Sequence, residues 1–243
     1  MYKNNKILVI IPARGGSKRL PGKNIKPING SPLISYAITA AKKSKYPDKI
    51  AVSTDDLKIA AVARKYGAEV PFLRPPELAS DTASTLSVIQ HAVNYFEKNE
   101  KFKPTIVVLI QPTNPLITSL DIDGTIEKMV EAKTKSCFSG TEISQRPEWM
   151  YRINSKKPAL FIKGKGTEKR SQDLPRLAII NGTVYATEYD TLMKRGLIQD
   201  NKSVGIYLMP KERSVDIDEL FDFELAKFLL QKQILNEKNK NRK

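Results

Sequence analysis

The fold of this chain is decided by residues 7–24, which read Ile7-Leu-Val-Ile-Ile-Pro-Ala-Arg-Gly-Gly-Ser-Lys-Arg-Leu-Pro-Gly-Lys-Asn24. The five aliphatic residues predict a buried strand, and this strand runs into a loop rich in glycine and positive charge. Glycine lets the backbone approach a ligand closely because it has no Cβ. A buried strand followed by such a loop is typical of α/β proteins that bind polyphosphate through backbone amides and fixed cations. The segment therefore predicts a phosphate-binding loop with four cations, Arg14, Lys18, Arg19 and Lys23.

Two common phosphate-binding motifs are excluded by the spacing of this loop. Five residues separate Gly16 from Gly22, and Asn24 follows Lys23 where a P-loop requires Ser or Thr. The Gly-x-Gly-x-x-Gly pattern of dinucleotide-binding folds is absent from the sequence. Taken alone, the segment leaves open the alternative of a basic surface turn without a ligand.

Length and composition set the class of protein. A chain of 243 residues with 40% hydrophobic side chains can form one large α/β domain with an appendage. Its first apolar run is too short for a signal-peptide core or a membrane span, and Cys137 is its single cysteine. We therefore expect a cytoplasmic protein with no membrane segment and no disulfide. Cys137 is expected to pack in a strand rather than act as a nucleophile, because the single histidine, His91, falls in a predicted helix without an evident partner.

The charge balance favours an anionic partner. A net charge of +15 arises from 41 Lys and Arg against 26 Asp and Glu, which fits either nucleic acid or a small anionic substrate. The sequence has no helix-turn-helix signal, zinc-ligand spacing or aromatic RNA-binding strand, so we expect no nucleic-acid partner. Residues 232–243 are basic and polar, and we expect them to form a fraying tail.

Strands alternate with helices along the first half of the chain. The hydrophobic pattern predicts strands at Ile7–Ile11, Lys49–Ser53, Glu69–Leu73 and Thr105–Ile110. It predicts helices at Pro32–Lys43, Leu57–Tyr66, Thr82–Lys98, Ser119–Ala132 and Glu219–Gln231, the first with Ser31 as cap. Near-continuous apolar strands joined by helices predict a mostly parallel sheet covered on both faces. In such a sheet the ligand binds beyond the carboxyl ends of the strands.

Polar groups follow these strand ends. Ser53-Thr-Asp-Asp56 follows the second strand, where Asp56 is a favoured helix cap. Arg74 precedes a proline-stiffened loop rich in hydroxyl groups, and Gln111 follows the fourth strand. Its carboxamide suits a sugar hydroxyl or a base edge because it both donates and accepts hydrogen bonds.

A pair of carboxylates stands near the other end of the chain, in Asp216-Ile-Asp218. On an extended segment both side chains point to the same side, because side chains alternate. Two such carboxylates suit Mg²⁺, which takes oxygen ligands and keeps several waters. The residues alone leave open the alternative that Asp218 caps the following helix and Asp216 is only solvated.

Taken together, these segments resemble the CMP-sialic acid synthetase (acylneuraminate cytidylyltransferase) family. The resemblance rests on motifs that occur in order along nearly the whole chain: Ile11-Pro-Ala-Arg-Gly-Gly-Ser-Lys18, Leu20-Pro-Gly-Lys-Asn24, Ser53-Thr-Asp-Asp56, Arg74-Pro-Pro-Glu-Leu-Ala-Ser-Asp-Thr-Ala-Ser84, Leu109-Ile-Gln-Pro-Thr-Asn-Pro-Leu116, Gln172-Asp-Leu-Pro175, Asn181-Gly-Thr-Val-Tyr185 and Asp216-Ile-Asp218. It implies a Rossmann-like α/β nucleotidyltransferase with a mostly parallel sheet and an extended dimerisation arm. The core is then expected at 1–139 and 181–231, and the arm, which joins a homodimer, at 140–180.

The resemblance also implies a reaction, in which CTP and a nine-carbon acidic sugar give the CMP-sugar and pyrophosphate. Catalytic roles fall to Arg14, Lys23 and Asp216. Mg²⁺ binding falls to Asp216 and Asp218, and sugar binding to Gln111, Arg170, Gln172 and Tyr185. The nucleotide-binding set is Ala13, Gly15, Ser17, Lys18, Asn24, Arg74 and Thr85.

The chain departs from the sialate pattern around the sugar. Many members of the family have two arginines before Gln-Asp-Leu-Pro, whereas here Arg170 is followed by Ser171. Apolar Ile179-Ile180 stands where a basic residue is often found shortly before the Asn-Gly-x-x-Tyr motif. Because an Arg fork is the preferred partner of a sugar carboxylate, Arg170 and Arg176 are its candidates. Sialic, legionaminic and pseudaminic acid stay open as substrates. Two alternatives are a related nucleotidyltransferase with another sugar or nucleotide, and a non-catalytic nucleic-acid-binding protein.

Overall fold

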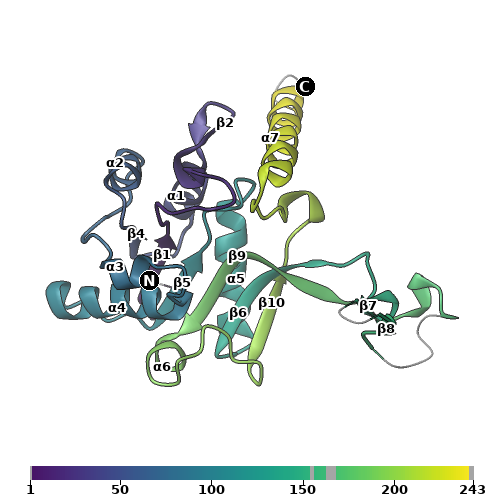
Figure 1. The fold of residues 1–243 in the computed structure, drawn as a ribbon. Helices are drawn as coiled ribbons and strands as arrows, with labels where there is room; N and C mark the ends of the chain where they lie inside the picture. The colour runs from purple at the N-terminus through teal and green to yellow at the C-terminus, as the bar shows by residue number, and fades with distance from the viewer. Residues whose placement is uncertain (1, 154–155, 163–167, 241–243) are drawn as a thin grey trace.

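The computed structural model describes residues 2–153, 156–162 and 168–240. Its centre is a six-stranded sheet with the order β10-β6-β9-β5-β1-β4 (Figure 1). The strands of this sheet are β1 (Ile7–Pro12), β4 (Lys49–Ser53), β5 (Ile106–Ile110), β6 (Ser136–Glu142), β9 (Ala178–Glu188) and β10 (Val204–Leu208). Small hairpins are formed by β2 (Pro27–Ile28) with β3 (Ser31–Pro32), and by β7 (Tyr151–Arg152) with β8 (Ala159–Leu160).

The helices join and cover these strands. They are α1 (Leu33–Lys43), α2 (Leu57–Lys65), α3 (Pro76–Ala79), α4 (Thr85–Glu100), α5 (Ser119–Glu131), α6 (Tyr189–Met193) and α7 (Leu220–Lys240). Short 3-10 turns are η1 (Lys23–Ile25), η2 (Pro147–Trp149), η4 (Ser171–Asp173) and η5 (Lys211–Arg213). In the part of the chain that the structure describes, no helix is long and apolar enough to cross a membrane.

The predicted mostly parallel sheet is confirmed. Strand β1 runs parallel to both β4 and β5, and β10 runs parallel to β6, whereas β9 is antiparallel to β5 and β6. Residues Ile7–Ile11 of β1 are 0% exposed, so this strand is covered on both faces. A strand buried on both faces needs a continuous apolar run rather than alternation, which explains the sequence that opens the chain.

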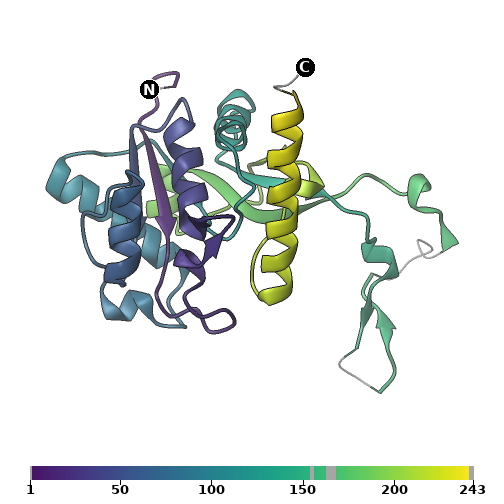
Figure 2. The ribbon, with the colours of Figure 1, turned by 90° about the horizontal axis from the view of Figure 1, so that it is seen from above.

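Each face of β1 packs against a different set of helices (Figure 2). Ile7, Val9 and Ile11 belong to a core cluster with apolar residues of α1, α2 and α5. Leu8 and Ile10 belong to a second cluster with residues of α4 and α6. The alternation of side chains along the strand thus divides the core into two layers, with the sheet between them.

The predicted third strand, Glu69–Leu73, is wrong. Residues 69–73 run alongside β4, but they form only isolated bridges at Glu69 and Leu73. Pro71 lies between the two bridges and has no amide hydrogen, so a continuous ladder cannot form there. The segment still serves the site, because the Arg74 amide donates to the Thr54 carbonyl and brings Arg74 beside the end of β4.

Several predicted helix ends shift by a few residues. Helix α1 begins at Leu33 with Pro32 as its N-cap residue, so the expected capping by Ser31 is wrong. Helix α4 begins at Thr85 rather than Thr82, because the Ser84 hydroxyl accepts from the Ser87 amide and sets the start. The predicted Asp56 cap is confirmed, since its carboxylate accepts from two amides at the start of α2.

Strands β6 and β9 pair with each other beyond the ends of their neighbours in the sheet, and this extension forms the base of the arm. Glu142 pairs with Ala178, and the described residues between these strands, 143–153, 156–162 and 168–177, project away from the rest of the molecule (Figure 1). Within the predicted arm, 140–180, the residues at both ends are therefore strand, while residues 154–155 and 163–167 lie outside the described part.

The predicted end of the last helix at Gln231 is wrong. Helix α7 continues to Lys240, so residues 232–240 of the expected tail are helical, and residues 241–243 lie outside the described part. Phe223, Ala226 and Leu230 pack in a third cluster with Ile217 and Leu20. This cluster ties the C-terminal helix to the loop that follows β1.

An alanine at Gly124 of α5 is expected to destabilise the protein by about 1–3 kcal/mol, because it overpacks the contact with β10. A Cβ at this position would lie 2.2 Å from Cε2 of Tyr207. In an ordinary helix interior the same change stabilises by about 0.5–1 kcal/mol, so the sign is diagnostic. Chemical denaturation of Gly124→Ala measures the free energy of unfolding.

Gly16→Ala is the control for that experiment, because a Cβ there would meet nothing within 4 Å. Its free energy of unfolding is expected to stay within about 0.5 kcal/mol of the wild type. A Gly124→Ala variant as stable as the wild type would contradict the close packing of α5 on β10.

Candidate functional site

The loop after β1 is held against the end of β4. The Ala13 amide donates to the Ser53 carbonyl, and the Gly15 amide donates to Asp55 Oδ1 at 3.1 Å. A Cβ at Gly15 would lie 2.8 Å from Asp56 Oδ2, so only glycine fits beside the cap of α2. The hydrogen bonds of the Ala13 and Gly15 amides thus fix the start of the loop. Neither residue lines the cleft described below, whereas Arg14 and Ser17 do.

The far end of the loop is fixed by polar and apolar contacts. Buried Asn24 donates from Nδ2 to the Arg14 carbonyl at 2.9 Å, which ties the two ends of the loop together. Lys23 Nζ donates to the Ile217 carbonyl at 2.6 Å. Leu20 is 7% exposed and packs with Ile217, so the loop has an apolar anchor as well as charges.

A cleft of about 520 Å³ lies where this loop meets the ends of β1, β4 and β5. Among the predicted site residues it is lined by Arg14, Ser17, Lys18, Lys23, Asn24, Arg74, Thr85, Gln111 and Asp218. These predicted site residues therefore lie together around the carboxyl ends of the strands, the edge at which such sheets bind ligands. Arg19, the fourth cation of the predicted phosphate-binding loop, also lines the cleft, and so do Asp81 and Thr113, which were given no site role from the sequence.

Four cations of the loop face two carboxylates across the cleft. Asp81 contacts Arg14 at 2.9 Å and Lys18 at 2.5 Å. Asp218 contacts Arg19 at 3.2 Å and Lys23 at 3.5 Å. Hydrogen bonds from Lys18 and Arg14 lower the pKa of Asp81, so its carboxylate stays ionised. The cleft is thus polar and cationic, as a triphosphate site requires.

Arg74 forms part of the inner wall of the cleft. It is 6% exposed, and its guanidinium donates to the hydroxyl and the carbonyl of Ser53. Burial is the main cause that lowers its pKa, and repulsion from Arg14 acts in the same direction. This arginine orients the end of β4 and leaves little of its surface for a ligand.

Asp216 and Asp218 lie on opposite sides of buried Ile217 in the chain, and both carboxylates stay accessible, as the alternation predicts. Gly182 has φ +72°, and a Cβ there would lie 3.2 Å from Asp216 Oδ2. Although the Asp216 side chain reaches solvent, protein packed around its carboxylate raises its pKa, and repulsion from Asp218 adds to this. Asp222, in the first turn of α7, accepts from the amides of Asp218 and Glu219 and so holds the two residues that precede the helix.

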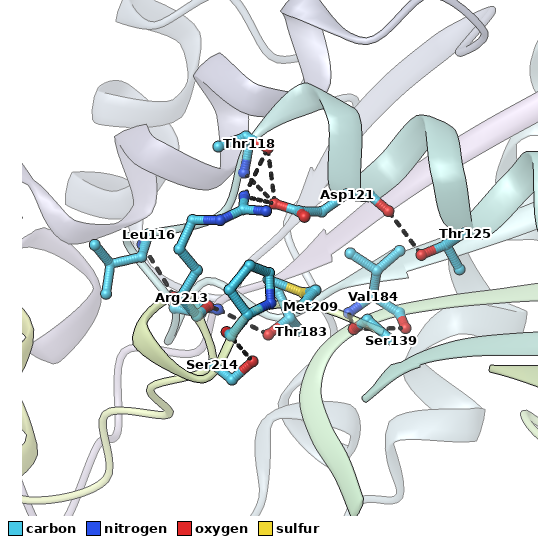
Figure 3. Close-up of polar contacts among 12 residues, drawn as sticks. Leu116, Thr118, Asp121, Thr125, Ser139, Thr183, Val184, Met209, Arg213 and Ser214 are labelled. Atoms are coloured by element: carbon cyan, nitrogen blue, oxygen red, sulfur yellow. Dashed lines mark hydrogen bonds and ion pairs between the residues drawn. The ribbon is translucent and has the colours of Figure 1, made fainter. Parts of the chain in front are cut away.

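The segment that carries these carboxylates is fastened to the sheet and to α5 (Figure 3). Arg213 forms an ion pair with Asp121, which is 0% exposed, and also donates to the Thr118 hydroxyl. Asn114 donates to the Thr183 hydroxyl and to the Arg213 carbonyl. These contacts join residues 69 to 99 positions apart in sequence, and they set where Asp216 and Asp218 lie.

The predicted sugar-binding residues lie in three places: the cleft, the central sheet and the arm. Gln111 lines the cleft. Tyr185 pairs with Leu109 in the sheet and packs beside the second core cluster, outside the cleft lining, and burial raises its pKa. Arg170 pairs with Asp173 within the arm, near exposed Gln172. The arm residues thus lie apart from the cleft within one chain.

Thiol chemistry has no support in the structure. Burial raises the pKa of the Cys137 thiol to about 12, so it stays protonated in its strand, as expected. His91 packs edge-on against Phe72, with ring centroids 4.7 Å apart. Over the described ranges, no group of three or more His, Cys, Asp and Glu side chains could hold a metal ion.

A sequence profile described as cytidylyltransferase matches residues 8–241. The chain belongs to this family. The match runs from the first strand through the cleft and the arm to the last helix, and it confirms the resemblance drawn from the motifs.

Among the curated relatives of this cytidylyltransferase, two are of similar length and a third is spanned by this chain over only about half of its length. It is 34% identical over 224 residues to pseudaminic acid cytidylyltransferase of Campylobacter jejuni, covering 92% of this chain and 96% of the relative. It is 34% identical over 230 residues to CMP-N,N'-diacetyllegionaminic acid synthase of Legionella pneumophila, covering 93% and 97%. It is 32% identical over 228 residues to N-acylneuraminate cytidylyltransferase of Escherichia coli, covering 94% of this chain and 53% of that relative.

Solved structures share the fold of this cytidylyltransferase. One is CMP:2-keto-3-deoxy-manno-octonic acid synthetase complexed with CTP, with TM-score 0.71, 18% identity and coverage of 94% and 99% of the two chains. Another is 4-diphosphocytidyl-2C-methyl-D-erythritol synthase from Anaerococcus prevotii, with TM-score 0.65, 14% identity and coverage of 93% and 96%. At these identities the likeness concerns the fold, and it confirms the predicted nucleotidyltransferase architecture.

Arg213→Met is expected to lower the free energy of unfolding of this cytidylyltransferase by about 3 kcal/mol, because it leaves the buried Asp121 carboxylate without its cation. The double variant Asp121→Asn/Arg213→Met should lose much less than the sum of the single losses. Denaturant titration of both single variants and the double variant measures the coupling. Lys211→Met in the same exposed turn is the control, with a change within about 0.5 kcal/mol; additive losses would contradict the coupling.

Asp216→Asn is expected to raise the melting temperature at pH 7, because it removes a carboxylate whose ionisation the fold disfavours. A raised pKa means that this destabilisation is present above the folded-state pKa and disappears as the pH falls below the ordinary value of 3.8. The gain should therefore shrink toward pH 4. Thermal unfolding across this range tests it, and an Asp216→Asn protein less stable than the wild type at pH 7 would contradict it.

Proposed function

We propose that this protein is a CMP-nonulosonate cytidylyltransferase. It would transfer the cytidylyl group of CTP to a nine-carbon acidic sugar and release pyrophosphate. The observation that carries the proposal is the 520 Å³ cleft, in which four cations of the loop after β1 face a pair of carboxylates, in a chain of the cytidylyltransferase family. The names of the relatives support a nonulosonic acid as the acceptor.

The chemistry asks for positioning and for neutralisation of charge. The anomeric hydroxyl of the sugar attacks the α-phosphorus in line, the bond to the pyrophosphate oxygen breaks, and the hydroxyl proton leaves. Arg14 and Lys23 would hold the triphosphate with help from Lys18, because a guanidinium and ammonium groups suit phosphate oxygens. Ser17, Asn24 and Thr85 line the same cleft and would surround the rest of the nucleotide. Ala13, Gly15 and Arg74 would hold the walls of the nucleotide site in place through their hydrogen bonds to Ser53 and Asp55.

Another pair of carboxylates, Asp216 and Asp218, suits a magnesium ion. Mg²⁺ binds to proteins through one or two carboxylates and keeps oxygen ligands from water and phosphate, so a pair such as Asp216 and Asp218 suffices. When bound, the ion would offset negative charge on the phosphates and on the leaving pyrophosphate. Asp218 now faces Arg19 and Lys23, so its engagement by the metal would free both cations for phosphate oxygens.

A second copy of this chain would complete the sugar site. Exposed apolar side chains gather on the arm and on the adjoining strands, at Trp149, Met150, Tyr151, Ile153, Phe161, Ile179, Ile180, Ile206 and Leu208. Exposed apolar side chains grouped on neighbouring elements mark an interaction site. In the proposed homodimer, the arm with Arg170 and Gln172 would reach the partner's cleft, near Gln111 and Tyr185. Because its nucleotide substrate is cytoplasmic, we place the reaction in the cytoplasm.

Pyrophosphate release tests the function. The wild type is assayed with Mg²⁺ and each of CTP, GTP, UTP and ATP against pseudaminic, legionaminic and N-acetylneuraminic acid. CTP with at least one nonulosonic acid should release pyrophosphate, and Lys23→Met should lower kcat/KM by roughly a hundredfold, because a cation on the phosphates is worth several kcal/mol in such a site. Lys156→Met, on the exposed arm surface, is the charge-matched control.

The panel also includes the eight-carbon 2-keto-3-deoxy-manno-octonic acid, because a solved structure of the same fold is named for it. Release with this sugar alone would keep the cytidylyltransferase reaction and replace the proposed acceptor. Release with another nucleotide alone would overturn the assignment of CTP. No release with any pair would contradict the proposal.

A further inference from the structure

Asp81 connects two walls of the cleft. It lies on the loop between α3 and α4, and it pairs with Arg14 and Lys18 of the loop after β1, which is more than 60 residues away in sequence. Arg14 also lies 3.5 Å from the Ser80 carbonyl, so the contact involves the loop backbone as well. Asp81, Arg14 and Lys18 all line the cleft.

The same two cations are those proposed to bind the triphosphate. A carboxylate and a phosphate oxygen compete for the same N–H donors, because both are anionic acceptors of similar geometry. Arg14 and Lys18 therefore cannot give all of their donors to Asp81 and to a triphosphate at once. Binding of CTP has to include an exchange of partners at this point.

The exposure of the three side chains makes this exchange easy. Asp81 is 49% exposed, and its partners Arg14 and Lys18 are 36% and 75% exposed. Exposed ion pairs contribute little to stability because water screens them. A triphosphate with several negative charges can therefore displace Asp81, and the cations stay close to their binding positions before it arrives.

We propose that Asp81 is an exchangeable internal competitor for the phosphate-binding cations. It keeps Arg14 and Lys18 oriented toward the cleft and limits the affinity for phosphate chains, so that pyrophosphate leaves after the transfer. The inference rests on the proposed function, because it takes the triphosphate as the group that exchanges with Asp81. In this view Asp81 is a positioning residue that acts through Arg14 and Lys18.

Direct binding to Asp81→Asn tests the inference. Titration calorimetry of the full chain with pyrophosphate alone, and with CTP in the presence of Mg²⁺, should give dissociation constants roughly three- to tenfold lower than those of the wild type. The size follows from the loss of two exposed ion pairs, each of which is weak. Asp81→Glu keeps the charge on a longer side chain and should bind within about twofold of the wild type.

Asp190→Asn is the matched control, because Asp190 is 55% exposed and pairs with Lys194 on α6, within its own helix. It removes the same charge and should leave both dissociation constants unchanged. In steady-state kinetics, Asp81→Asn should lower KM for CTP and the inhibition constant of pyrophosphate while KM for the sugar stays the same. A purely structural role of Asp81 would not produce this split.

The outcomes separate the two proposals. Wild-type and Asp81→Asn proteins that bind pyrophosphate and CTP equally, or a variant that binds them more weakly, would overturn the role of Asp81 and leave the proposed function standing. Equal tightening in Asp190→Asn would also overturn it, because the effect would then come from net charge alone. A wild type that binds neither compound would overturn the proposed function, and the role of Asp81 with it.

Discussion

The burial of β1 between two parallel neighbours is the constraint on which the rest of the structure depends. Its residues Ile7–Ile11 are fully covered, and β1 and β4 end together because Pro12 lies opposite Ser53. A parallel sheet directs all of these strand ends to one edge. The loop after β1 therefore leaves the sheet where β5 delivers Gln111 and where the backbone of β4 accepts the Ala13 amide. The cations of that loop line one cleft only because this edge of the sheet is fixed.

The loop after β1 is attached to the rest of the protein by apolar and backbone contacts, and its charged side chains form ion pairs. Leu20 is buried in an apolar cluster with α7, and Asn24 closes the loop on the Arg14 carbonyl. The four cations would repel one another at such short range, and Asp81 and Asp218 offset that repulsion from opposite sides. Three of these four ion pairs are exposed to water and are therefore weak, whereas the Lys23 side chain is 13% exposed. The apolar cluster around Leu20 holds the loop independently of these ion pairs.

The position of Asp216 and Asp218 depends on contacts that no local pattern specifies. The two carboxylates flank buried Ile217, which is a local property. Their distance from the cationic loop is set instead by the ion pair of Arg213 with Asp121 and by the hydrogen bonds of Asn114. A fully buried carboxylate requires its cation, so this pair holds the segment in one place.

The sequence by itself determined β1, the glycine-rich loop, the alternation of strands and helices, and the Asp56 cap. Each of these follows from hydrophobic periodicity or from turn chemistry within a few residues. The failed strand at 69–73 also has a local cause, since Pro71 cannot donate to a ladder. Only the tertiary structure decided that Arg74 turns inward to Ser53, that Tyr185 lies outside the cleft lining, and that Asp81 and Asp218 divide the four cations between them. These features depend on which side chains meet across long loops, and the free energies that select among such pairings arise only when the burial of the core has fixed the positions of the strand ends.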